Sequence, residues 1–159
     1  MKAGEAMVAI RRAEERDVTA MAAIRAEAWG TQEYWEPRVG AYLAGAVSAR
    51  DAQAECAVFV AEIDGAVAGV ASGHRTTRHR CQGELQWMNV ARAHQGRGIA
   101  GNLLAAMAGW FVEQGAMRVC VDVEPGNAAA RAFYARHGAV ELKPSWMVWE
   151  DVRVAIAVT

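Results

Sequence analysis

The feature that most constrains the fold is a strand–turn–strand segment near the middle of the chain. Residues 56–63 form a mostly apolar run, CAVFVAEI, and residues 66–71 form a second one, AVAGVA. Asp64 and Gly65 stand between the two runs, and an Asp-Gly dipeptide favours the tight turn of a β-hairpin. The fold must therefore contain an antiparallel pair of strands, and the arrangement of the other elements has to accommodate it.

Composition limits the class of protein. The chain has 159 residues, of which 53% are hydrophobic and 22% charged, and its formal net charge is −1. This is typical of a globular protein, and the length predicts one domain over residues 1–159. Neither a nucleic-acid partner nor a membrane is expected from this charge and hydropathy. Three cysteines without metal-ligand spacing fit a reducing compartment, so we expect a cytoplasmic protein with no metal site.

Helical and strand-like patterns alternate around the hairpin. Asp17 and Thr31 are expected to cap two helices, and Pro37 predicts a late start or a kink in the second. Further strands are expected at residues 8–13, 84–90, 119–123, 139–142 and 146–154, and helices at 18–28, 32–43, 98–115 and 127–137. The order predicts an α/β (α+β) fold with a mixed sheet.

The stretch HQGRGIAG, residues 94–101, raises two interpretations. Gly96, Gly98 and Gly101 match a dinucleotide-binding fingerprint, and Asp122 follows at a suitable distance. However, residues 91–95 separate the glycines from the preceding strand, whereas that fingerprint places its first glycine directly after one. An antiparallel hairpin also comes first, and the remaining chain is short for a complete dinucleotide sheet. A dinucleotide oxidoreductase is therefore the weaker interpretation.

The physical properties of this loop do not depend on that choice. Backbone N–H groups of residues 96–100 precede or begin a helix, where they form a concavity suited to phosphate. Glycines at positions 96 and 98 leave the approach free of side chains, and Arg97 adds a positive charge. The simpler alternative is a glycine-rich loop with no ligand.

Two motifs in this order resemble those of the GNAT superfamily of N-acetyltransferases. Gln95, Gly98 and Ala100 match its coenzyme A pattern, Gln/Arg-x-x-Gly-x-Gly/Ala. The segment from Asn127 to Gly138, NAAARAFYARHG, resembles its second landmark. The order of elements agrees over residues 8–150. One departure is Arg92, which stands where that family usually has a loop proline.

The resemblance implies a fold and a coenzyme site. The fold would be a mostly antiparallel sheet of six to seven strands, flanked by about four helices and splayed between the fourth and fifth main strands. The pantetheine arm of acetyl-CoA would lie in the splay, and its pyrophosphate on the glycine loop. The residues implied in coenzyme binding are Met88, Asn89, Val90, Gln95, Gly96, Arg97, Gly98, Ile99, Ala100, Asn127, Arg131 and Tyr134.

The chemistry of amine acetylation suggests three catalytic groups. A primary amine with a pKa near ~10.4 must lose a proton before it attacks a thioester, a cost of roughly 4–5 kcal/mol at neutral pH. Glu84, eleven positions before Gln95, is our candidate base, at a spacing similar to the catalytic glutamate of the protein-lysine-acetylating branch of that family. The Met88 N–H would stabilise the oxyanion, and Tyr134 would protonate the leaving thiolate. The simpler roles are an exposed strand glutamate and a core tyrosine.

Several other residues have a minor functional interpretation. In a regular strand Glu84, Gln86 and Met88 share one face and Trp87 takes the other, unless a bulge intervenes. The tryptophans at 29, 35, 87 and 146 could line an acceptor pocket, with core packing as the alternative for at least half of them. The arginines at 75, 78 and 80 are most simply a solvated loop, and otherwise contact an anion.

The sequence therefore predicts a cytoplasmic, acetyl-CoA-dependent N-acetyltransferase that works by direct transfer in a ternary complex. A small-molecule amine is preferred as the acceptor over a protein or peptide, because no acidic run attracts a basic peptide. A non-catalytic acyl-CoA-binding or sensor module is the alternative from another class. A homodimer is among the expected assemblies, since many proteins of that family are dimers.

Overall fold

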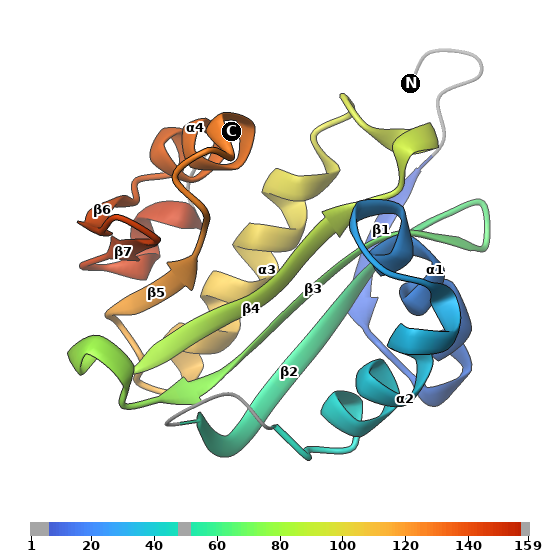
Figure 1. Cartoon of the computed structure of the whole chain (residues 1–159), viewed down its shortest axis with the longest axis horizontal. Coiled ribbons are helices and arrows are strands. Elements are labelled where there is room, and N and C mark those ends of the chain that lie inside the picture. Colours follow the sequence, from blue (N-terminus) through green and yellow to red (C-terminus); the bar gives the residue numbers. More distant parts are fainter. Residues whose placement is uncertain (1–6, 48–51, 157–159) are drawn as a thin grey trace.

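The computed structural model describes residues 7–47 and 52–156 of the chain (Figure 1). The strands are β1 (Val8–Arg12), β2 (Ala52–Ile63), β3 (Ala66–Thr76), β4 (Gly83–Val90), β5 (Val119–Asp122), β6 (Val140–Lys143) and β7 (Trp146–Trp149). The α-helices are α1 (Val18–Ala28), α2 (Gln32–Leu43), α3 (Ile99–Glu113) and α4 (Ala128–Arg136). None of the helices in these ranges is long and apolar enough to span a membrane. Residues 1–6, 48–51 and 157–159 of the expected domain lie outside the described residues.

The strands form one sheet in the order β1-β2-β3-β4-β5-β7-β6. Every neighbouring pair is antiparallel except β4 and β5, which are parallel. The hairpin joins β2 to β3 through Asp64 and Gly65, whose φ angles of 50° and 81° belong to the left-handed turn region. The predicted mixed, mostly antiparallel sheet with about four helices is confirmed.

Helices cover both faces of the sheet, and each face has its own hydrophobic core (Figure 1). The α1–α2 pair packs on one face, where Met21, Trp35 and Tyr42 meet Trp87 of β4. On the other face α3 contributes large apolar side chains at helical spacing, which are buried: Leu103, Leu104, Met107, Trp110 and Phe111. The period-two alternation of β2 and β3 supplies both cores, because neighbouring strand residues point to opposite faces.

The start of α1 differs from the expectation. Asp17 occupies the predicted N-cap position of α1, but its side chain makes no capping hydrogen bond to the helix. Arg11 takes up both carboxylate oxygens, at 2.8 and 2.9 Å, and the Glu14 N–H donates to one of them at 2.8 Å. Thr31 does cap α2, since its hydroxyl accepts from the Tyr34 N–H at 3.1 Å.

Two other local expectations are also corrected. The second helix, α2, begins at Gln32 and runs through Pro37, so the expected late start is wrong. The last strand ends at Trp149 instead of Val154, because residues Val152–Ala155 form a short 3₁₀ helix. Asp151 caps that helix by accepting from the Arg153 N–H at 3.1 Å, which turns the chain away from the sheet.

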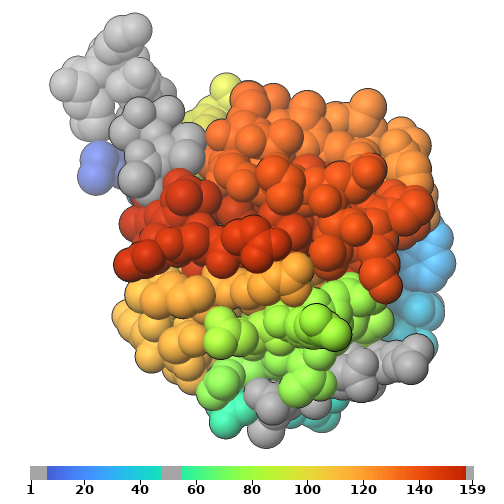
Figure 2. Space-filling view, turned by 90° about the vertical axis from the view of Figure 1, so that its left-hand side faces the viewer, coloured from blue at the N-terminus to red at the C-terminus, as the bar shows by residue number. Residues whose placement is uncertain are grey.

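The C-terminal segment closes one end of the molecule. Figure 2 shows α4 and the β6–β7 pair covering this end, above the connection between β3 and β4. The ring of His79 in that connection stacks edge-on against Trp146 at 4.7 Å, and the Arg78 guanidinium lies 5.0 Å from the same tryptophan ring. The packing brings the β3–β4 connection beside β7, next to the parallel β4–β5 pair.

Candidate active site

A β-bulge in β4 decides which side chains face the helices. Ser72 of β3 pairs with Trp87, but the next residue, Gly73, pairs with Leu85, so Gln86 is an extra residue. As a result Leu85 lies in the α3 core, whereas Trp87 lies in the α1–α2 core. Glu84 and Trp87 therefore share a face, which is the exception expected in the presence of a bulge, and the regular-strand arrangement does not apply.

The bulge connects Glu84 to the α1–α2 side through a buried chain of contacts. The Tyr42 ring lies 4.9 Å from the Trp87 ring, and its hydroxyl is 2.9 Å from Nδ1 of His74. Nε2 of His74 is in turn 3.7 Å from Oε1 of Glu84. The Glu84 carboxylate is only 6% exposed and accepts a hydrogen bond from Nε of Arg78 at 3.0 Å. This ion pair fixes the orientation of the carboxylate.

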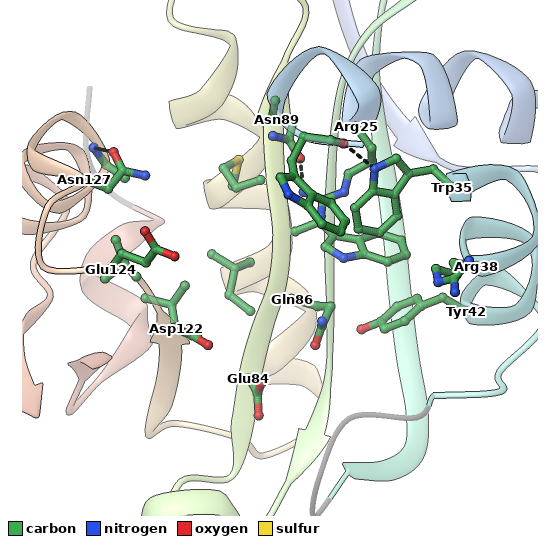
Figure 3. Close-up of a pocket in the computed structure, with 18 of the residues that line it drawn as sticks. Arg25, Trp35, Arg38, Tyr42, Glu84, Gln86, Asn89, Asp122, Glu124 and Asn127 are labelled. Atoms are coloured by element: carbon green, nitrogen blue, oxygen red, sulfur yellow. Dashed lines mark hydrogen bonds between the residues drawn. The ribbon is translucent and has the colours of Figure 1, made fainter. Parts of the chain in front are cut away.

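A cavity of about 1030 Å³ lies between α1–α2 on one side and β5, α4 and their connection on the other (Figure 3). We call it the acceptor cavity. All four tryptophans that the sequence suggested line it: Trp29, Trp35, Trp87 and Trp146. Three carboxylates also line it, those of Glu84, Asp122 and Glu124. The acceptor cavity is therefore lined by both aromatic rings and charged groups.

The carboxylates at positions 122 and 124 were missed by the sequence reasoning for this site. Asp122 ends β5 and Glu124 follows it, so both lie across the cavity from Gln86 (Figure 3). Burial raises the pKa of Asp122 above its ordinary value, and the negative charge of Glu84 adds to the shift. A polar residue ending the apolar run VCVD is the signal that could have identified Asp122.

Arg25 of α1 was also missed. Its guanidinium lies 4.1 Å from the Trp35 ring and 5.2 Å from the Trp87 ring, and it donates to Oδ1 of Asn89 at 2.7 Å. Burial lowers the pKa of Arg25 to about 10, so the group still carries its charge at neutral pH. Because one arginine on a helix surface is a common pattern, the sequence alone gave no reason to select it.

A second cavity, of about 940 Å³, lies on the α3 side of β4, and we call it the glycine groove. It is lined by the loop after β4, the first turn of α3, and α4. Gly96 and Gly98 have φ angles of 82° and 77°, and a Cβ at either position would meet no atom within 4 Å. Gly101 instead lies inside α3, where a Cβ would meet the His137 ring at 3.3 Å.

The glycine groove suits a phosphate group. The first N–H groups of an α-helix have no carbonyl partner in a preceding turn, and the helix dipole adds partial positive charge there. The glycine conformations leave this end of α3 uncovered by side chains. The loop is also held in place, since Gln95 Nε2 donates to the Val90 carbonyl at 3.2 Å. Arg92, at the position of the usual proline, ties the loop to α1 by donating to the Glu27 carbonyl at 2.7 Å.

The parallel pair β4–β5 separates next to both cavities. Residues 83–85 of β4 pair with residues 119–121 of β5, and no pairing continues along the described remainder of β4. The predicted splay between the fourth and fifth strands is therefore confirmed. Residues 86–90 border a gap where backbone groups are available to an extended ligand.

The two cavities meet at this gap. Met88, Ala130 and Tyr134 line both of them. Tyr134 is 7% exposed, and burial raises the pKa of its phenol above the ordinary value, so it holds its proton at neutral pH. Tyr134 and Met88 thus stand on the wall that the two cavities share.

The remaining predicted site residues are distributed differently. Asn127 lines the acceptor cavity and caps α4, accepting from the Ala130 N–H at 3.2 Å. Asn89 also lines the acceptor cavity, whereas Val90, Ile99 and Ala100 line the glycine groove. Arg97 and Arg131 line neither cavity. Arg131 donates to the carbonyls of Val123 and Pro144 at 3.2 and 3.3 Å and to the Glu141 carboxylate at 2.9 Å.

Residues 9–139 match the Acetyltransferase (GNAT) family. The chain belongs to the GNAT acetyltransferase family. Acetyl-CoA is the co-substrate of this family. No curated protein sequence matches the chain.

Solved GNAT structures share the fold. A GNAT-family protein from Desulfovibrio desulfuricans has a TM-score of 0.74 at 20% identity, covering 92% of this chain and 99% of its own. An aminoglycoside N-acetyltransferase in complex with coenzyme A has a TM-score of 0.73 at 19% identity, covering 90% and 94%. The ribosomal-protein-alanine N-acetyltransferase of Brucella melitensis has a TM-score of 0.67 at 24% identity, covering 88% and 96%. The acceptors named for these GNAT proteins differ widely, from aminoglycosides to a ribosomal protein.

Proposed function

We propose that this chain transfers the acetyl group of acetyl-CoA to a primary amine of a small molecule, by direct attack in a ternary complex. The observation that carries the proposal is the shared wall of the two cavities at Met88 and Tyr134. A coenzyme in the glycine groove and an amine in the acceptor cavity would meet there without leaving the protein. A covalent enzyme intermediate is not needed.

The coenzyme would be held mainly by backbone. Residues 95–100 bind the pyrophosphate, and residues 88–90 bind the pantetheine arm in the gap beside β4. Asn127 and Tyr134 approach the arm from the α4 side. Arg131 has a positioning role in this proposal, because its guanidinium is occupied in holding the connection between β5 and α4.

The chemistry then needs proton transfers at two points. Acetyl-CoA supplies an activated acetyl thioester, which the amine nitrogen attacks. The amine proton goes to Glu84, and the Tyr134 hydroxyl gives a proton to the departing sulfur. Glu84 is four residues from Met88, roughly 13 Å along an extended strand. The proton lost by the amine therefore reaches the Glu84 carboxylate through water. The Met88 N–H donates to the oxyanion of the tetrahedral intermediate.

The shape and charge of the acceptor cavity support a small acceptor. Its walls come from both helices of the α1–α2 pair and from the opposite side of the gap, and four tryptophans reduce the space between them. We also place the reaction in the cytoplasm, because the chain carries cysteines that are free in the described structure. A peptide acceptor and a non-catalytic sensor remain as defined outcomes of the test below.

The test is thiol release from acetyl-CoA against a panel of small amines and N-terminal peptides, with Glu84→Gln beside the wild type. The expected result is turnover on small amines and a kcat at neutral pH that falls by roughly 10- to 100-fold in the variant. Glu62→Gln is the matched control, because Glu62 also pairs with an arginine on a strand, at 2.6 Å from Arg11, but lies outside both cavities.

Each outcome has a defined meaning. Coenzyme binding without thiol release on any acceptor would support a sensor and contradict the enzyme. Turnover on peptides alone would replace the small-molecule acceptor. An undiminished kcat in Glu84→Gln would remove this residue from the mechanism and move the test to Asp122→Asn.

A further inference from the structure

The acceptor cavity has opposite charges on its two sides. Asp122 and Glu124 lie on the β5–α4 side, while Arg25 and Arg38 lie on the α1–α2 side (Figure 3). Glu84 and Gln86 of β4 lie between the two sides at the floor, and Arg78, which also lines the cavity, is paired with Glu84. A ligand that bridges this cavity would therefore meet carboxylates at one end and a guanidinium at the other.

The guanidinium of Arg25 lacks an anionic partner among the residues that the structure describes. No ion pair in the described ranges 7–47 and 52–156 includes Arg25, and its Nε is a buried atom with no hydrogen-bond partner there. Among the described residues, the guanidinium donates a hydrogen bond to a neutral amide, that of Asn89. Burying a cation against two indole rings without an anion costs free energy, and an anionic ligand would offset that cost.

A complementary unpaired group lies on the floor of the same cavity. Oε1 of Gln86 is buried and has no hydrogen-bond partner among the described residues. The bulge in β4 sets this side chain beside Glu84, below the rings of Trp35 and Tyr42, which we call the aromatic wall (Figure 3). Among the described residues, the cavity thus offers one unpaired donor, the Nε–H of Arg25, and one unpaired acceptor, the Gln86 side-chain oxygen, which lies near carboxylates.

We propose that the acceptor is an amino-acid-like zwitterion, whose carboxylate binds Arg25 and whose amino group lies toward Gln86 and the acidic side. This inference rests on the proposed acetyltransferase function and names its substrate class. Arg25 is bonded to Asn89, which directly follows Met88 in the chain. The anion subsite is therefore close to the transfer point, which suits an α-amino acid better than an amine with a distant carboxylate.

The aromatic wall limits the rest of the substrate. Trp35 is fixed because its indole Nε1 donates to the Trp29 carbonyl at 2.6 Å, and Arg25 is held against Trp35. A preorganised arginine loses little conformational entropy when it binds a planar carboxylate with two N–H groups. The side chain of the amino acid would then lie along the aromatic rings.

The test compares L-α-amino acids with their matched decarboxylated amines, such as L-phenylalanine with 2-phenylethylamine. The readout is the ratio of the two kcat/KM values within one protein, which does not depend on the fraction of enzyme that is folded. Wild type is expected to favour the amino acid by about 10- to 100-fold, the worth of a hydrogen-bonded charge pair. In Arg25→Gln the ratio should fall to near unity, and Arg25→Lys should retain part of it.

Arg12→Gln is the matched control, because Arg12 also lies over an aromatic ring, Phe59, at 5.4 Å, but lines neither cavity. Its ratio should equal that of the wild type. A wild-type preference for the decarboxylated amine, or an unchanged ratio in Arg25→Gln, would overturn the zwitterionic acceptor and leave the acetyltransferase intact. Absence of thiol release with every amine would instead overturn the proposed function, and this acceptor with it.

Discussion

The two cavities beside β4 are built from different parts of the chain. The glycine groove is formed largely by backbone and small residues, among them Gly96, Gly98 and Ala100. The acceptor cavity is formed by long aromatic and charged side chains, such as those of Trp35, Arg25 and Glu84. A backbone site holds a ligand common to a family, whereas a side-chain site can change its ligand by substitution.

The largest effect should come from placing a side chain in the backbone site. Gly98→Val forces a β-branched residue into a φ of 77° and projects it into the groove. We expect the dissociation constant for coenzyme A, measured by calorimetry, to rise by at least roughly 100-fold. Gly115→Val is the control, because Gly115 has a similar φ of 74° and lines neither cavity. Wild-type affinity in Gly98→Val would show that the coenzyme does not lie on this loop.

The next effect concerns the support of the side-chain site. Asp17→Asn removes one charged partner of Arg11, the one at the start of α1, the helix that carries Arg25. We expect about 2 kcal/mol less unfolding free energy at pH 7, by urea denaturation. In this variant the KM for the acceptor should rise while the dissociation constant for coenzyme A stays near that of the wild type. An equal rise in both values would contradict the division between the two cavities.

This effect has a defined pH dependence. Hydrogen bonds from Arg11 lower the pKa of Asp17, so the folded protein binds this proton less tightly than the unfolded chain. The stabilisation is present above the unfolded pKa of about 3.9 and is lost as the pH falls through the folded value. The difference between wild type and Asp17→Asn should therefore shrink below about pH 4. Asp151→Asn, which breaks an exposed pair with Arg153, should change little at any pH.

The smallest effect should arise at the wall that both cavities share. Tyr134→Phe removes one hydroxyl, and kcat should fall by roughly tenfold, because a thiolate with a pKa near 8.5 already leaves readily. The KM values for both substrates should stay near those of the wild type. Tyr34→Phe, on α2 and outside both cavities, serves as the control. A change in acceptor KM without a change in kcat would place Tyr134 in binding and not in proton transfer.

The sequence predicted the backbone site better than the side-chain site. Asp64-Gly65 and the spacing of Gln95, Gly98 and Ala100 are local signals, and local signals determine a turn and a helix start. The acceptor cavity depends on contacts between residues far apart in the chain. Arg25 and Asp122 line the same cavity because α1 and β5 lie on opposite sides of β4. No local sequence pattern contains this arrangement.

The departures from expectation have the same origin. Asp17 has the residue type of an N-cap, but the nearby Arg11 offers its carboxylate a stronger partner than the helix does. The bulge could not be predicted from β4 alone, since it arises in the pairing with β3. A Cβ at Gly73 would meet Met107 and Phe111 at 2.6 Å, so α3 packs tightly against this point of the sheet. The register of β4 at this point therefore depends on β3, β4 and α3 together.

The extra residue at Gln86 also adds a polar group to the acceptor cavity without disturbing its neighbours. Gly73 pairs with Leu85 and Ser72 with Trp87, so deleting Gln86 would leave a regular strand in which the later residues of β4 keep their present faces. Trp87 and Asn89 would stay beside Arg25, whereas the Gln86 amide would be lost from the cavity floor. A single-codon deletion would thus change the polarity of the acceptor cavity while leaving the glycine loop in place.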